Sequence, residues 1–407
     1  MNEITGSLPG GTSAPAPATT PMPMAALLAL TMCSFIATAN EAVPAGLLPR
    51  MARDFGVSQG WAGQLVTLCA LGSGLAAIPL TVALRGWRRR WVLLLSVGGF
   101  FVCNAITALA SHFPLALAAR FMAGIATGLA WSLLAGYARR MVAPSQQGRA
   151  MAVAMVGIPL ALALGVPLGA WLGGLAGWRT VFGILAGMSL ALVAWVVRAV
   201  PDYPGQTAAR RVPMRRVWTT PGVRPVLGVV LAWILAHYTL YTYVAPLLAA
   251  LGLGERVDAA LLVFGVASLC GIGFTGALVD RGLRRLVLGS LAAFALVALA
   301  LGQGALPAGG VYVMLALWGL SFGGAPTLLQ TALADAAGDG AEVAQSMLVT
   351  VFNLAFAAGG AMGGVLLETA GAGALPQAIL ALLLLAWGLA WRARTHGFRP
   401  GRRGAAH

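Results

Sequence analysis

The sequence predicts an all-α, polytopic membrane protein with twelve transmembrane helices. Of its 407 residues, 59% are hydrophobic and only 9% are charged, and the mean hydropathy of +0.86 lies far above that of soluble globular proteins. Apolar runs of roughly 18 to 25 residues, the length that crosses a hydrocarbon core, recur along the chain. These runs lack the alternation of barrel strands, and a backbone in lipid must satisfy its own hydrogen bonds, so we expect helices.

Short polar or Gly- and Pro-containing breaks separate these runs. In chain order the expected spans are Met24 to Leu48, Trp61 to Leu84, Trp91 to Ala110, Pro114 to Ala138, Met151 to Leu172, Thr180 to Val197, Val226 to Ala250, Ala259 to Val279, Leu286 to Leu306, Gly310 to Ala334, Val343 to Leu367 and Leu375 to Trp391. Residues 1–22 have neither a basic start nor a small-residue cleavage site near an apolar core, so we expect a disordered cytoplasmic tail and no removable signal peptide.

The basic residues predict the orientation in the membrane. All 26 are Arg, and the formal net charge is +15. If the amino terminus is cytoplasmic, the loops after spans two, four, six and eight and the carboxyl tail hold twenty-one of them, whereas the opposite side holds only Arg50, Arg53, Arg179 and Arg256. This asymmetry follows the positive-inside rule and predicts an inner-membrane protein with both termini in the cytoplasm. We expect these charges to contact anionic membrane lipid and not nucleic acid.

The chain divides into two similar halves. The longest polar break, residues 198–224, falls between spans six and seven, which predicts bundles at 23–199 and 223–392, a cytoplasmic linker at 200–222 and a basic tail at 393–407. "TVALRGWRRR" joins spans two and three, and "GALVDRGLRR" joins spans eight and nine. "NEAVP" near the end of span one likewise corresponds to "TYVAP" in span seven. Parallel repeats of six helices are typical of transporters that rock two bundles about a central site.

Three segments carry a resemblance to a known family: "EAVPAGLLPRMARDFGVSQGWAGQLVTLCALGSGLAAIPLT", "AARFMAGIATGLAWSLLAGYARRMV" and "GIPLALALGVPLGAWLGGLAGWR". The chain resembles the major facilitator superfamily, and more closely its twelve-span drug:proton antiporter branch, which includes bacterial sugar, nucleoside and chloramphenicol efflux proteins. The resemblance implies a monomer that exports a small organic solute in exchange for protons by alternating access, with no cofactor. The alternative is a proton-coupled importer or a uniporter of a sugar or nucleoside.

Glu41 and Arg120 are the candidates for proton coupling. A charge near the bilayer centre costs about 2.5–3.5 kcal/mol on insertion scales, so an acid inside span one needs a partner or a function. At 1.5 Å per residue, Glu41 lies roughly 10 Å and Arg120 roughly 9 Å below the same edge of the membrane. Arg120 also belongs to "RFMAGIATG", which resembles the fourth-span motif whose arginine is associated with proton coupling. A static ion pair, or a glutamate that reaches outward to water, is the alternative.

The loop after span eight resembles the family's cytoplasmic gating motif. Its residues are Gly276, Asp280, Arg281, Arg284 and Arg285, and the acid at a helix end forms charge-assisted hydrogen bonds that break and re-form as the halves rock. A loop that only fixes topology is the alternative. The copy in the first half departs from the motif, because Arg85 stands where the acid is expected and Thr81 where the glycine is expected.

Span five carries small residues at helical spacing, Gly165, Gly169 and Gly173, together with Pro167. This spacing lets two helix backbones approach closely, and the proline supplies a bend. The pattern partly resembles the antiporter motif that packs span five against the second half. Similar glycines in spans four and eleven, and the four cysteines Cys33, Cys69, Cys103 and Cys270, are interpreted as packing residues.

The polar and aromatic residues within the spans predict the substrate cavity. Amphipathic rings bind organic solutes by contact area while a few polar groups orient them. The candidates are Asn40, Trp131, His237, Tyr238, Tyr241, Tyr243, Gln330 and Asn353, with the densest group in span seven. We expect His237 to be a neutral, hydrogen-bonded imidazole.

Two other classes of membrane protein fit the sequence poorly. An enzyme needs convergent nucleophiles, bases or metal ligands, and Glu41 is the only acid within the spans. A Walker-type phosphate loop requires lysine, which the chain lacks, so it does not hydrolyse ATP through such a loop. A sensor is expected to carry a folded soluble domain, and no segment is long enough for one.

Overall fold

The computed structural model describes residues 22–84, 86–143, 146–205 and 214–399, and this part of the chain is helical with no strand. Residues 1–21 and 400–407 of the expected tails, residues 206–213 of the expected linker, and Arg85 therefore lie outside the described residues. The helices are α1 (Met24–Phe55), α2 (Gln59–Ala83), α3 (Arg89–Leu109), α4 (Phe113–Arg140), α5 (Gln147–Met155), α6 (Gly157–Leu160), η2 (Ala161–Gly165), α7 (Val166–Ala176), α8 (Trp178–Ala199), α9 (Met214–Thr219), α10 (Val223–Thr242), α11 (Val244–Ala250), η3 (Gly254–Arg256), α12 (Val257–Gly302), α13 (Ala308–Gly323), α14 (Ala325–Ala337), η4 (Gly338–Gly340), α15 (Ala341–Ala370) and α16 (Ala374–Arg392).

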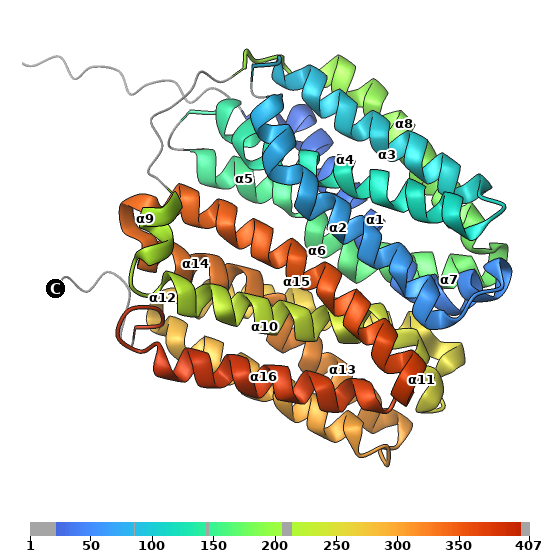
Figure 1. Ribbon diagram of the computed structural model, residues 1–407. Coiled ribbons are helices and arrows are strands. Elements are labelled where there is room, and N and C mark those ends of the chain that lie inside the picture. The colour runs from blue at the N-terminus through green and yellow to red at the C-terminus, as the bar shows by residue number, and fades with distance from the viewer. Residues whose placement is uncertain (1–21, 85, 144–145, 206–213, 400–407) are drawn as a thin grey trace, which may run out of the picture.

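The helices run roughly side by side in two groups, with α1–α8 in the upper part of Figure 1 and α10–α16 in the lower part. The described ends of the inter-half segment and the start of the carboxyl tail lie at the same end of the helices. Arg88 and Arg140 contact residues 202 and 204, and Arg284 contacts the end of α16, so these arginines lie at that end too. We call it the arginine-rich face and the other end the opposite face.

The described helices account for most of the expected spans. Ten helical stretches are long and apolar enough to cross a membrane. One of them contains α12, which combines expected spans eight and nine and leaves helical geometry only at Gly282 (φ −173°, ψ 55°). The expected second span coincides with α2, a helix of 25 residues that is not among the ten. Twelve spans thus stay a prediction that this arrangement fits.

Prolines explain why several spans consist of more than one helix. Proline has no backbone N–H and leaves the carbonyl four residues earlier without its helical partner. Pro246 does this to Thr242, where α10 gives way to α11 at Tyr243. Pro167 does the same to Ala163 inside the π-helical turn η2, a geometry that inserts one residue into the helix. These breaks re-aim the side chains near the centre of the bundle.

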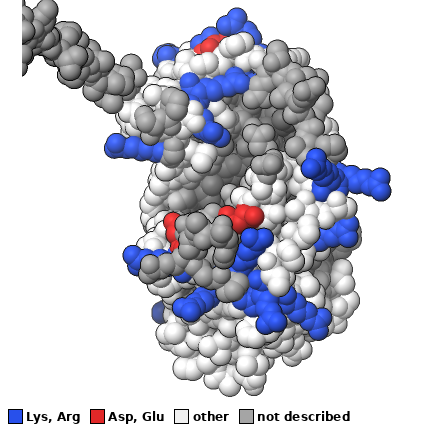
Figure 2. Space-filling view, turned by 90° about the vertical axis from the view of Figure 1, so that its left-hand side faces the viewer, with Lys and Arg blue, Asp and Glu red and all other residues white. Residues whose placement is uncertain are grey.

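The two groups of helices are joined at the opposite face and separate at the arginine-rich face. One buried apolar cluster combines the opposite-face parts of α1, α7 and α8 with the core of α10–α16. A second cluster holds the arginine-rich part of α1 with α3, α4, α5 and α8, and it contains no residue of α10–α16. Figure 2 views the arginine-rich face and shows it hollowed between the halves, with Arg side chains on both sides of the hollow. The protein is therefore open toward this face.

Candidate transport site

Glu41 lies on α1 at the space between the two halves. Its side chain is partly exposed, unlike that of its neighbour Asn40, which is fully buried. The carboxylate is placed to accept a hydrogen bond from the Trp131 side chain of α4. It also lies near Tyr238, on α10 of the other half. The carboxylate thus faces residues of both halves and does not point into lipid.

Arg120 is fully buried behind Glu41, inside the first half. Its guanidinium donates a hydrogen bond through Nη2 to the backbone carbonyl of Asn40 and lies over the Phe182 ring, 5.5 Å from its centroid. The expected equal depth of Glu41 and Arg120 is therefore seen, since Arg120 bonds to the residue next to Glu41. Among the described residues no ion pair within 4.0 Å joins them, which argues against the static ion pair.

The surroundings of Arg120 leave several polar atoms without partners in the described part of the chain. Nε and Nη1 of Arg120 make no hydrogen bond, and neither side-chain atom of Asn40 makes one. Buried polar groups are normally paired, and groups that are not often mark functional sites or the places of bound water. The buried cation therefore acts on Glu41 through space rather than through a bond that fixes both side chains.

Tyr238 provides the matching surface on the second half. Its ring is partly exposed, stacks on Phe356 of α15 with the centroids 3.5 Å apart, and meets the edge of Phe352. Asn353, on the same helix, is nearly buried against Gly74 of α2 and donates to the carbonyl of Val349. Of the expected cavity residues, the structure thus brings Trp131 and Tyr238 together around Glu41.

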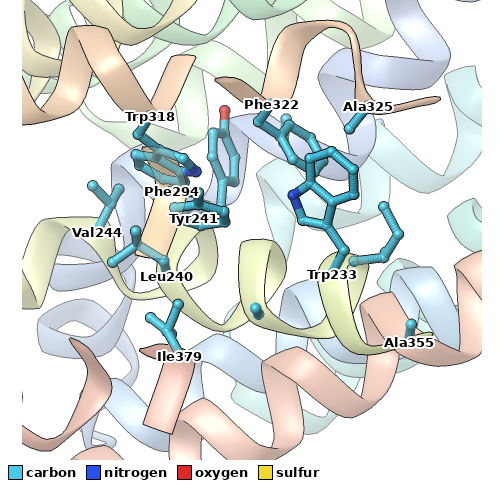
Figure 3. Close-up of a cluster of buried hydrophobic side chains, with 14 of the residues drawn as sticks. Trp233, Leu240, Tyr241, Val244, Phe294, Trp318, Phe322, Ala325, Ala355 and Ile379 are labelled. Atoms are coloured by element: carbon cyan, nitrogen blue, oxygen red, sulfur yellow. The ribbon is translucent and has the colours of Figure 1, made fainter. Parts of the chain in front are cut away.

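His237 lies inside the second half, on a different side of α10 from Tyr238. Its Nδ1 accepts a hydrogen bond of 3.1 Å from the Trp318 indole, and its ring stacks on Phe322 with the centroids 3.3 Å apart. Because an indole N–H only donates, this bond requires an unprotonated Nδ1 and hence the expected neutral imidazole. Figure 3 shows the surrounding aromatic cluster, in which Tyr241, Phe294, Trp318 and Phe322 lie near one another.

The remaining cavity candidates lie away from Glu41. Tyr241 is buried in the aromatic cluster, and its hydroxyl makes no hydrogen bond to a described residue. Tyr243 is fully buried where α10 ends, toward the opposite face. Gln330 is exposed on α14, beyond the break after Gly323. Trp318 and Phe322, which surround His237, were not among the expected residues, because aromatic residues in an apolar span are usually part of the core.

The turn at Gly282 carries the expected gating residues of the second half. Arg284 donates to the carbonyls of Ala390, Trp391 and Phe398, at 2.8, 2.9 and 3.3 Å, and so caps the end of α16. Gly276, Asp280, Arg281 and Arg285 are exposed near this turn. The hydrogen bonds of Arg284 thus lie within the second half, where they tie neighbouring helices of one bundle together.

In the first half, an acid from the inter-half segment binds the turn that precedes α3. Asp202 pairs with Arg88 at 2.5 Å and accepts from the backbone N–H of Arg90 at 3.2 Å. Burial acts to raise the pKa of Asp202, but the hydrogen bonds from Arg90 and Arg88 outweigh it and hold this pKa below its ordinary value. Tyr137 donates to the carbonyl of Pro201, which fixes the segment further. The sequence motif gave no hint of Asp202, because it lies far from the loop in the chain.

The glycines of span five lie against α1 and not against the second half. A side chain at Gly165, Gly169 or Gly173 would meet Phe35, Val43 or Leu47, respectively. The contact with the second half is made by the neighbouring backbone instead, since Gly265 of α12 packs directly on Leu162 and Ala163. Span five therefore packs against the second half, as the motif implies, while its three glycines face α1.

Comparisons with known proteins identify the family. Residues 30–364 match the family model of the Major Facilitator Superfamily. The chain is 30% identical over 352 residues to the purine ribonucleoside efflux pump NepI of Escherichia coli (strain K12), covering 85% of this chain and 88% of that protein, and the same figures hold for NepI of Shigella flexneri.

A solved structure gives the same fold. The crystal structure of the human organic anion transporter MFSD10 (TETRAN) superimposes with a TM-score of 0.68 and covers 91% of this chain and 100% of that one, at 16% sequence identity. At this identity the likeness concerns the fold alone. Together with the membrane helices and the match along most of the chain, these findings establish that the protein is a multi-pass membrane transporter, not an enzyme, and belongs to the Major Facilitator Superfamily.

Proposed function

We propose that this protein exports a nucleoside-like organic solute across the inner membrane in exchange for protons. The observation that carries the proposal is the position of Glu41: a carboxylate between the two halves, beside Trp131 and Arg120 of its own half and near Tyr238 of the other. The hollow opens on the arginine-rich face, which the positive-inside rule assigns to the cytoplasm. An exporter takes up its substrate from that side.

The chemistry of the cavity suits an aromatic solute that carries hydrogen-bond donors. Tyr238 and Trp131 offer partly exposed rings on which a planar base can stack, and Glu41 offers a carboxylate that accepts hydrogen bonds. The similarity to purine ribonucleoside efflux pumps supports a substrate of this class.

Coupling follows from competition at the carboxylate. An ionised Glu41 accepts hydrogen bonds from the substrate on both oxygens, whereas a proton removes its charge, turns one oxygen into a donor and so weakens substrate binding. The protonated, empty site can then return to the other side of the membrane. The guanidinium of Arg120 lies behind the carboxylate and interacts with its charge without fixing it in an ion pair. Proton binding and substrate binding therefore oppose each other at one group, which is the requirement for exchange.

The test uses purified protein in liposomes, with inosine, adenosine and guanosine as substrates. We expect a pH gradient to drive nucleoside movement in the wild type when the solution at the opposite face is the more acidic one. A pH-sensitive dye reports the accompanying proton movement. Glu41→Gln should lose the gradient-driven movement, because an amide does not titrate, but keep the exchange of labelled for unlabelled nucleoside, because its carbonyl oxygen still accepts a hydrogen bond and the rings and the fold persist.

Glu255→Gln is the matched control, since Glu255 is an exposed acid at the opposite face. It should behave as the wild type. Gradient-driven movement that survives Glu41→Gln removes Glu41 from the coupling mechanism. If none of the nucleosides moves in the wild type, the proposed substrate class is wrong.

A further inference from the structure

The two halves meet at the opposite face through a crossing of α2 and α15 that is built on glycines. A side chain at Gly360 would meet Thr67 of α2, and one at Gly364 would meet Gln64. On the other helix, a side chain at Gly60 would meet Glu368 of α15. The backbones approach closely because these positions carry no side chain. This crossing must separate before the protein can open toward the opposite face.

Tyr243 fills the crossing from a third helix. Its ring is fully buried where α10 breaks, and its hydroxyl lies 2.8 Å from the carbonyl oxygen of Gly360 and 3.3 Å from that of Gly60. A side chain at Gly63 would collide with this hydroxyl. One hydroxyl thus lies between a carbonyl of the first half and a carbonyl of the second.

Glu368, which is exposed, binds the same residue of α2 through its backbone N–H. Its Oε1 accepts a hydrogen bond of 3.0 Å from the backbone N–H of Gly60, in the first turn of α2. A helix begins with N–H groups that have no intrahelical partner, and it favours negative charge at this end. Gly60 therefore donates to one second-half side chain and accepts from another.

We propose that Tyr243 and Glu368 form a latch that closes the opposite face by holding Gly60 of the first half. The two hydrogen bonds at Gly60 join the first half to the second, so they exist only when this face is closed, whereas the bond from Tyr243 to Gly360 lies within the second half. The inference goes beyond the proposed function, because the latch acts whatever the substrate and whatever the coupling ion. Tyr243 occupies the position in the second repeat that Glu41 occupies in the first. In this proposal Tyr243 closes the opposite face, whereas Glu41 binds the proton and the substrate.

Distance measurements between spin labels test the latch without substrate or gradient. The labels are placed on α2 and α15 at Trp61→Cys and Thr369→Cys, which are exposed at this face, in a Cys270→Ser background because the other three cysteines are buried. The wild type should give mainly the short, closed distance. Each hydrogen bond that is removed should lower the closed-to-open ratio roughly 2- to 10-fold.

The variants remove single atoms or charges. Tyr243→Phe keeps the ring and loses the hydroxyl, and Glu368→Gln keeps the shape and loses the charge. Tyr241→Phe is the matched control, because its buried hydroxyl makes no bond within the described chain. Gly63→Ala should open the crossing by collision, whereas Gly183→Ala, with nothing within 4 Å, should not.

The expected result is a longer-distance population in Tyr243→Phe, Glu368→Gln and Gly63→Ala. It should be largest in the double variant that combines Tyr243→Phe with Glu368→Gln, and absent in the controls Tyr241→Phe and Gly183→Ala. The latch is refuted if the double variant keeps the wild-type distances, or if Tyr241→Phe lengthens them equally. A failure of nucleoside transport would leave this measurement unaffected.

Discussion

Asp202 pairs with Arg88 across a distance of 2.5 Å and also caps the first turn of α3 through the Arg90 N–H. The family motif of this loop places an acid where this chain has Arg85, and Asp202 supplies a carboxylate to the same turn from the inter-half segment. Tyr203 adds a backbone bond to Arg89, 2.9 Å long. The segment is thereby fastened to the first half before it crosses to the second.

We predict that Asp202→Asn destabilises the protein at neutral pH, by about 1 kcal/mol, because it loses a charge-assisted bond and the favourable charge at a helix start. The folded pKa of Asp202 lies below its ordinary value of about 3.9, so this stabilisation is present above that value and is lost as the pH falls through the folded pKa. Thermal unfolding in detergent should show the difference at neutral pH and a smaller one near pH 3.

Arg120→Met should raise the unfolding temperature while abolishing proton-coupled transport. Within the described residues Arg120 is a fully buried cation without an ion pair, so its one hydrogen bond offsets the desolvation cost only in part. Apolar replacement of buried ionic groups is often neutral or stabilising, by up to about 4 kcal/mol. The function needs the charge, so stability and transport should change in opposite directions. A lower unfolding temperature in this variant would show that the Asn40 bond outweighs the desolvation cost.

Gly265→Ala should weaken the contact between α12 and η2. A side chain there would lie 2.5 Å from the Cα of Ala163 and 2.6 Å from the carbonyl oxygen of Leu162, so the backbones must move apart at a cost of about 1–3 kcal/mol. Gly187→Ala, where nothing lies within 4 Å, should be neutral or stabilising, by up to about 1 kcal/mol. Thermal unfolding of the two variants provides the comparison.

Trp318→Phe should cost about 1–3 kcal/mol, because it leaves Nδ1 of the buried His237 without its donor. In a double-mutant cycle, His237→Phe combined with Trp318→Phe should cost less than the sum of the single changes, since neither partner then stays unpaired. Additive costs would mean that the hydrogen bond contributes no coupling energy. Chemical unfolding of the four proteins measures this.

The sequence was sufficient for the fold because the length of each apolar run is set by the bilayer. It was less informative where a helix leaves the apolar run: α1 continues to Phe55, seven residues beyond the expected Leu48, and ends at Gly56 with a positive φ of 65°. It also separated spans eight and nine by a loop, where the structure has one non-helical residue. Polar residues outside the apolar run can extend a helix without any hydropathy signal.

The sequence predicted how deep the site residues lie in the membrane, but not toward which neighbouring helix each side chain points. Counting residues placed Glu41 and Arg120 at one level, and Arg120 does bond to Asn40. Counting does not say which face of a span meets which neighbour. His237 and Tyr238 are adjacent in the chain, yet one is enclosed by Phe322 and Trp318 while the other is partly exposed near Glu41. Whether each side chain is buried or exposed is decided by the packing of helices that are distant in the sequence.

The single non-helical residue at Gly282 also restricts how the transporter can move. With no slack between the two arms of α12, neither arm can slide by a helical turn past the other, and Arg284 anchors the bend to α16. The two arms of α12 and the last helix, α16, are thus held together as one rigid unit. Inserting a few flexible residues at this bend would uncouple the two arms, so the second half could no longer rotate as one rigid body.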